Sequence, residues 1–153
     1  MINYYYALLF PYFSYNVIIW GSTFQTHLEP LIVQQKRIIR IIAGVGFLDH
    51  TNELFHRFKI LKFTDIYKYF VCITMFKRMK VNFYQDIHNA NTRNRNEIRP
   101  AYQRLTTTQH SFEYCGPKIW NELPASIKNL PNIDVFKRKL RLHFINQYVQ
   151  SIL

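Results

Sequence analysis

The sequence has few acidic residues and almost no cysteine. Nine Asp and Glu stand against twenty Lys and Arg among its 153 residues, which gives a formal net charge of +11 at pH 7. Such an imbalance points to a polyanionic partner, either nucleic acid or an anionic membrane surface. The two cysteines, Cys72 and Cys115, are too few for a disulfide framework. We therefore expect free thiols and a reducing compartment.

Several catalytic patterns are also missing. A nucleic-acid polymerase needs neighbouring carboxylates that hold two metal ions. The aspartates of this chain are isolated from one another: Asp49, Asp65, Asp86 and Asp134. The four scattered glycines form no phosphate-binding loop, and no Cys and His cluster has the spacing of a zinc site. His50, Glu53 and His56 are spaced by three, which drifts around a helix, so we interpret them as polar surface residues. The sequence thus predicts no catalytic residue, metal site or cofactor in this chain.

The first part of the chain has no charged residue before Glu29. Residues 4–20 are apolar enough to be considered as a membrane anchor. Pro11, Ser14 and Asn16 interrupt this run, however, and it is short for a bilayer span of about 20 residues. The pattern therefore favours a helix over residues 3–20 that is kinked at Pro11 and buried on all sides in a bundle.

Hydrophobic periodicity predicts a mainly α-helical bundle. Helices are expected at residues 25–42, 52–57, 65–80 and 132–148, with one more turn at 82–88. Thr51, Thr64 and Asn132 are the expected N-caps, and Gly44 is expected to end the first of these helices. Residues 65–80 have few polar positions, so this helix is predicted to be the most buried. The apolar face of residues 25–42 comprises Leu28, Leu31, Ile32, Gln35, Ile38, Ile39 and Ile42.

A polar stretch divides the chain at residues 89–110. Its arginines alternate with Asn and Thr, and Pro100 blocks a helix, so we predict a basic loop that ends in an extended piece over 104–108. The expected organisation is a bundle over 1–88, this loop, and an irregular appendage over 111–153 that could include a short hairpin. The three parts are expected to fold as one unit.

An unusual motif opens the last part of the chain. It contains, in order, Gly116, Pro117, Trp120, Asn121, Leu123 and Pro124. Gly116 and Pro117 predict a turn or a helix start, because Gly tolerates positive φ and Pro suits the first helical position. Trp120, held between stiff flanks, is interpreted as a core residue, and Pro124 stops any helix.

The same motif, G-P-x-x-W-N-x-L-P-x-x-I through Ile127, resembles the C-terminal region of non-LTR retrotransposon reverse transcriptases of the jockey-like kind. Four further segments agree with that family in the expected order. They are FPYFSY with IWG at residues 10–21, QQKRIIRII at 34–42, HT, LF and ILKFTDI within 50–66, and FKRKL at 136–140. Asn16 stands where the family usually has Gly, and Glu53 stands where Pro is common.

The resemblance implies that this chain is a thumb-like helical bundle with the extension that follows it. The catalytic palm, with its adjacent aspartates and Mg²⁺, would lie upstream of Met1, so the isolated chain is expected to be inactive. The implied partners are an RNA/DNA template–primer and the remainder of the polymerase, inside the cell, in cytoplasm and nucleus. Two alternatives remain: an inactive remnant reading frame of a decayed element, and a membrane-associated helical protein anchored by residues 4–20.

Three basic groups are candidate phosphate contacts, which would set affinity and register without reading base sequence. They are Lys36, Arg37 and Arg40; Arg93, Arg95, Arg99 and Arg104; and Lys137, Arg138 and Arg141. On the last helix, Ile133, Phe136, Leu140 and Phe144 are predicted to face the bundle. The three cations of this helix are therefore predicted to project into solvent on a shared arc.

Overall fold

The structure, a computed structural model, describes residues 2–78 and 97–150. Within these ranges the chain is mainly α-helical, so the predicted fold class, a mainly α helical bundle, is confirmed. These ranges contain no β-strand, and the hairpin that the sequence allowed is not found in them. The predicted turn at 82–88 lies outside the described residues.

The N-terminal segment is divided into four short helices: α1 Ile2–Tyr4, the π-helix η1 Tyr5–Leu9, α2 Phe10–Ser14 and α3 Val17–Trp20. The predicted kink at Pro11 is wrong. Pro11 lies in the first turn of α2, where a proline is tolerated. The break comes at Asn16 instead, whose φ of 46° lies in the left-handed region that Asn and Gly tolerate best. The left-handed turn at position 16 therefore accommodates Asn as well as Gly.

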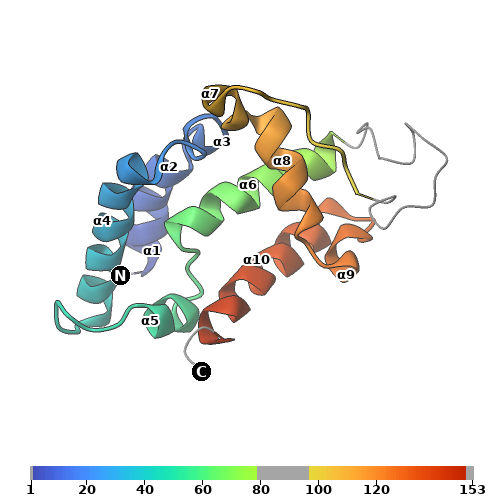
Figure 1. Cartoon of the computed structure of the whole chain (residues 1–153). Coiled ribbons are helices and arrows are strands. Elements are labelled where there is room, and N and C mark those ends of the chain that lie inside the picture. The colour runs from blue at the N-terminus through green and yellow to red at the C-terminus, as the bar shows by residue number, and fades with distance from the viewer. Residues whose placement is uncertain (1, 79–96, 151–153) are drawn as a thin grey trace.

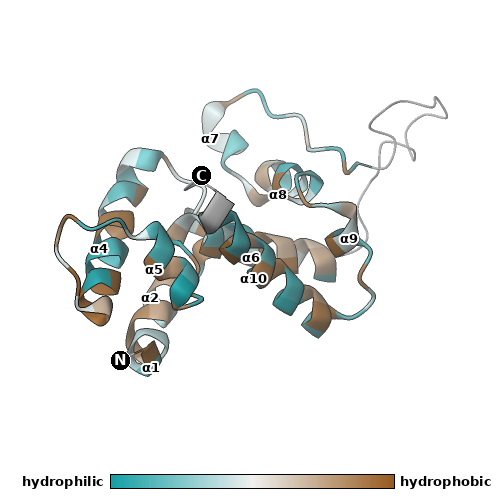
Figure 2. Ribbon diagram, turned by 90° about the horizontal axis from the view of Figure 1, so that it is seen from below, coloured by the Kyte–Doolittle hydropathy of each residue, from teal (hydrophilic) through white to brown (hydrophobic). Residues whose placement is uncertain are grey.

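Only one side of this segment is buried. Tyr5, Phe13 and Val17 enter the core. The opposite side is apolar and 60 to 80% exposed, at Tyr4, Leu8, Tyr12, Tyr15 and Ile19. Figure 2 shows α1 and α2 at the edge of the molecule. The prediction that this segment is buried on all sides is therefore wrong, because the other helices pack against only one of its sides. Within the described ranges, no helix combines the length and apolarity that crossing a membrane requires.

The next two helices agree closely with the sequence pattern. Helix α4 is Gln25–Ala43 and helix α5 is Asn52–Arg57. The predicted apolar face of α4 is confirmed, with Leu28, Gln35 and Ile39 fully in the core. Gly44 ends α4 in the left-handed conformation, with a φ of 68°, as expected for a helix C-terminus.

Helix α6, Phe63–Lys77, is the central helix (Figure 1). It packs against α3, α4, α8 and α10, and eight of its side chains are buried, which confirms the prediction. The predicted cap at Thr64 is wrong, since the helix begins at Phe63, two residues before the predicted start, and its N-cap is Lys62. Gln35 of α4 accepts a hydrogen bond from the Phe63 backbone N–H at 2.8 Å. A remote side chain therefore satisfies this helix end.

The C-terminal third comprises α7 Thr106–Gln109, α8 Phe112–Asn121, α9 Ala125–Lys128 and α10 Ile133–Gln150. The extended piece expected at 104–108 is wrong, because residues 106–109 form a helical turn. The start of α10 is as expected, since the Asn132 side chain accepts a hydrogen bond from the Asp134 backbone N–H at 2.8 Å. Helix α10 packs against α5, α6 and α9, so the two ends of the chain share one core.

The motif at 116–124 has a structural explanation in this fold. Gly116 and Pro117 lie inside α8, which begins at Phe112, so the predicted helix start at these residues is wrong. A side-chain carbon at Gly116 would lie 3.0 Å from the Met75 sulfur, so glycine allows α8 to approach α6 closely. Trp120 is buried and stacks on Phe136 with ring centroids 5.8 Å apart, as a core residue should.

The remaining motif residues fix the neighbouring chain. The Asn121 side chain donates to the Ile98 carbonyl at 2.9 Å and accepts from the Ile98 N–H at 3.1 Å. This pair of bonds holds Ile98 of the basic loop against α8. Leu123 is buried, and Pro124 immediately precedes α9.

Candidate nucleic-acid interface

A cationic groove lies between the N-terminal segment, α6 and α10. It consists of two adjoining cavities that share Tyr69, Lys137 and Arg141. We call the first, of about 500 Å³, the aromatic pocket; its lining is Tyr6, Phe10, Leu61, Tyr69, Phe70, Ile73, Thr74, Lys77, Lys137 and Arg141. The second, of about 540 Å³, is the outer pocket; its lining adds Lys59, Asp134, Arg138, Leu142 and Ile145.

The charge of this groove is strongly positive. Five cations line it: Lys59, Lys77, Lys137, Arg138 and Arg141. Among the described residues that line it, Asp134 is the one acid. Its carboxylate lies 3.3 Å from the Lys137 ammonium in an exposed pair, and such pairs are weak and screened by salt. The groove can therefore attract a polyanion.

Arg141 differs from the prediction that it projects into solvent. Its Nη2 donates hydrogen bonds to the Lys59 carbonyl, at 2.9 Å, and to the Tyr6 hydroxyl. Its guanidinium also lies 5.4 Å from the centroid of the Tyr6 ring. Arg141 thus joins α10 to the N-terminal segment and to the turn before α6. The shared solvent arc predicted for α10 is therefore wrong at this position, because a neighbouring element covers it.

The other two predicted cations of α10 have different environments. Arg138 is exposed on the wall of the outer pocket. Lys137 is half-buried and lines both pockets, next to Asp134. Of the three predicted basic groups, the one on α10 therefore lines the groove.

Sequence reasoning missed two groove cations. Lys77 lies seven residues after Phe70 on α6, so helical periodicity could have placed both on one face. Lys59 lies in the turn between α5 and α6 with a φ of 53°. No sequence signal marks it, because a left-handed lysine is uncommon and its position depends on the packing of two helices.

The two tyrosines of the groove are held neutral. Burial raises the pKa of Tyr6 and Tyr69, and the nearby Arg141 charge lowers it by a smaller amount. Both phenols therefore keep their protons well above neutral pH. The groove presents them to a ligand as uncharged aromatic rings.

The basic group of α4 lies elsewhere. The Arg37 and Arg40 guanidiniums lie 5.7 and 5.8 Å from the centroid of the Phe47 ring. Arg40 also donates to the Asp49 carbonyl at 2.9 Å. Lys36 is half-buried on the same helix, and none of the three lines the groove. This group supports the loop after α4.

The described arginines of the basic loop lie outside the groove. Arg99 and Arg104 are exposed and do not line the groove. Arg93 and Arg95 lie outside the described residues. The three predicted basic groups are therefore not brought together in the described part of the chain.

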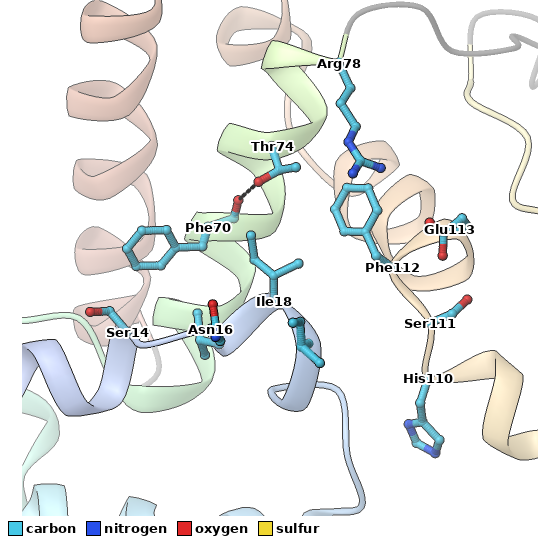
Figure 3. A pocket seen from close by; sticks show the side chains of 12 residues that line it. Ser14, Asn16, Ile18, Phe70, Thr74, Arg78, His110, Ser111, Phe112 and Glu113 are labelled. Atoms are coloured by element: carbon cyan, nitrogen blue, oxygen red, sulfur yellow. Dashed lines mark hydrogen bonds between the residues drawn. The ribbon is translucent and has the colours of Figure 1, made fainter.

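Another cavity, of about 590 Å³, lies between α3, α6 and the start of α8 (Figure 3). Figure 3 shows the Arg78 guanidinium beside the Phe112 ring, whose centroid is 4.8 Å away. Glu113 also lines this cavity. The positive charge of Arg78, the one arginine among the described lining residues, is therefore offset by a carboxylate. The cavity is therefore less suited to a polyanion than the cationic groove.

Neither a metal centre nor a relative identifies the chain. Across residues 2–78 and 97–150, no group of three or more His, Cys, Asp and Glu side chains is arranged to hold a metal ion. In comparisons with known proteins, the chain matches no protein-family model, no curated protein and no solved structure.

Proposed function

We propose that the chain is the C-terminal, thumb-like part of a non-LTR retrotransposon reverse transcriptase, which holds an RNA/DNA template–primer by phosphate contacts and lacks the catalytic palm. The observation that carries the binding function is the cationic groove, with five cations and one acid. The parent family is supported by the sequence resemblance. The remainder of the polymerase would be its partner, and the cytoplasm and nucleus its location.

The arrangement of the groove suits contacts with a nucleic-acid backbone. Lys77 at the end of α6 and Arg138 on α10 are both exposed, and each is carried by a helix of 15 or more residues. Rigid supports hold such charges at a constant spacing. Contacts with phosphates would position the nucleic acid without reading its sequence.

Exchange of groove charges tests this proposal. Lys77→Glu combined with Arg138→Glu should weaken binding to an RNA/DNA hybrid and lower the salt slope of binding by roughly 0.9 for each lost contact. Both residues are exposed, so the fold should be retained. Arg99→Glu combined with Arg104→Glu is the matched control, because it changes the net charge equally at exposed positions outside the groove.

Fluorescence anisotropy titrations at several salt concentrations would measure both effects. Equal losses in the groove variant and the control variant would show that binding does not depend on the groove in particular. An unchanged salt slope in the groove variant would remove the groove from the interface.

We expect no primer extension by this chain, because none of its aspartates has a neighbouring carboxylate in the sequence. Mg²⁺-dependent extension by the purified chain would contradict this. The remnant alternative is tested by the genomic sequence upstream of Met1, where an in-frame palm with adjacent aspartates supports the polymerase and stop codons support the remnant.

A second candidate function, association with a membrane surface, is favoured by the exposed apolar side of residues 4–19. Five large apolar side chains there are more than half exposed. Co-sedimentation with anionic lipid vesicles tests it, and Tyr12→Glu with Ile19→Glu should abolish vesicle binding if this side inserts between lipids. Unchanged binding by that variant would exclude this side as the contact.

A further inference from the structure

The aromatic pocket combines two features that a plain phosphate site does not need. Four aromatic side chains line it: Tyr6, Phe10, Tyr69 and Phe70. Three cations, Lys77, Lys137 and Arg141, line it as well. Among the described residues, no carboxylate belongs to its lining. A ligand that fills this pocket should therefore have a flat, apolar part and a negative charge.

The aromatic rings come from two different elements. Tyr6 and Phe10, in the N-terminal segment, have ring centroids 5.7 Å apart and planes inclined by 55°. Tyr69 and Phe70 of α6 have centroids 5.6 Å apart and planes inclined by 83°. All four side chains are only half-buried, so part of each ring faces the cavity that they line. The volume, about 500 Å³, lies within the range of small-ligand sites.

Arg141 is already held in place at this site. Its guanidinium lies 5.4 Å from the Tyr6 ring centroid and donates to the Lys59 carbonyl. These contacts use one guanidinium nitrogen, whereas arginine has five N–H donors on three nitrogens. A cation that is oriented before the ligand arrives loses little side-chain entropy on binding.

We propose that the aromatic pocket takes one unpaired nucleotide of a single-stranded nucleic acid, with the base on the aromatic rings and the phosphate on the cations. This inference rests on the proposed function and adds that, within the groove that holds the template–primer, the aromatic pocket binds an unpaired nucleotide. Bases stack on aromatic side chains with little regard to sequence. In a duplex the bases are paired and stacked on each other, so a duplex would reach only the exposed cations.

Two strands of the same length test the pocket: a short oligodeoxyadenylate and an abasic strand with the same number of phosphates. The wild-type chain should bind the base-bearing strand at least about fivefold more tightly, which is the lower limit for one stacked base. Tyr69→Leu and Phe70→Leu, tested separately, keep an apolar side chain and remove the ring. Each should reduce this preference more than it reduces the affinity for a blunt RNA/DNA hybrid.

Tyr102→Leu is the matched control, because Tyr102 is 86% exposed and does not line the pocket. It should leave all three affinities unchanged. A second measurement needs no pocket variant: 2-aminopurine within the strand should lose fluorescence when the wild-type chain binds it, because the probe stacks on a ring.

The outcomes separate this inference from the proposed function. Equal affinity for the base-bearing and abasic strands, with no change in 2-aminopurine fluorescence, would overturn the pocket assignment. The proposed function would stand in that case if the hybrid affinity still depended on Lys77 and Arg138. If those charges affected no nucleic acid, the proposed function itself would fail. Binding of anionic vesicles that the two leucine variants abolish, without effect on either strand, would assign the pocket to a lipid and also overturn the inference.

Discussion

Replacement of Gln35 should be among the most damaging single changes in this protein. Its side chain is 1% exposed and makes three hydrogen bonds with two other parts of the core. Nε2 donates to the Tyr5 hydroxyl at 2.8 Å and to the Leu61 carbonyl at 2.9 Å. Oε1 accepts from the Phe63 N–H at 2.8 Å. One amide thereby joins the N-terminal segment, α4 and the start of α6.

Gln35→Met keeps the size and the helix propensity of the side chain but leaves three buried polar groups without a partner. Each unpaired group costs about 1–3 kcal/mol. Three such groups give an expected total loss of roughly 3–9 kcal/mol. Domains of this kind are stable by only about 5–15 kcal/mol, so the variant should be close to unfolding.

Urea denaturation, followed by circular dichroism and tryptophan fluorescence, would measure this loss. Gln34→Met is the matched control, since it is the same substitution on the adjacent, exposed position of α4 and should stay within about 0.5 kcal/mol of wild type. Tyr5→Phe removes one of the three partners and should cost about 1 kcal/mol. Equal stabilities of the Gln35→Met and Gln34→Met proteins would refute the assignment of Gln35 as the residue that caps α6.

Three further predictions use the same denaturation assay. Gly21→Ala should cost about 1–3 kcal/mol, because the added carbon would lie 2.5 Å from the Val17 carbonyl oxygen, whereas Gly46→Ala, with its nearest contact at 3.4 Å, should be nearly neutral; similar midpoints for both would contradict the close packing at Gly21. Trp120→Ala should cost roughly 3–5 kcal/mol, since it empties a large aromatic site, and an unchanged midpoint would mean that this side chain is not part of the core. Burial raises the pKa of Asp65 above its ordinary value of 3.8, so the stability that this group contributes is greatest below that pH and is lost as pH rises through the folded-state pKa. Asp65→Asn should flatten that decline, and an identical pH profile for the variant would show that Asp65 does not cause it.

The candidate site was only partly accessible from the sequence. The periodicity of residues 133–144 placed Lys137 and Arg138 next to an apolar stripe, and both line the groove. It also predicted a solvent-exposed Arg141, because a helical pattern does not show which other segment will cover a given face. The aromatic walls come from the N-terminal segment and α6, and no local pattern indicates that these two segments face α10 across a cavity. The family resemblance remains a prediction that the comparisons did not support.

The sequence by itself determined the mainly helical class, the extent of α4, α5 and α10, the stop at Gly44 and the cap at Asn132. These features depend on residues within a few positions of one another, where hydrophobic spacing and backbone preferences act directly. Only the tertiary structure decided that Gln35 caps α6, 28 residues further along, and that Arg141 binds Tyr6, 135 residues before it. It also decided that Gly116 and Pro117 lie within a helix. The physical reason is that a buried polar group must be paired wherever the chain brings a partner, and packing of helices that are distant in sequence determines which partner that is.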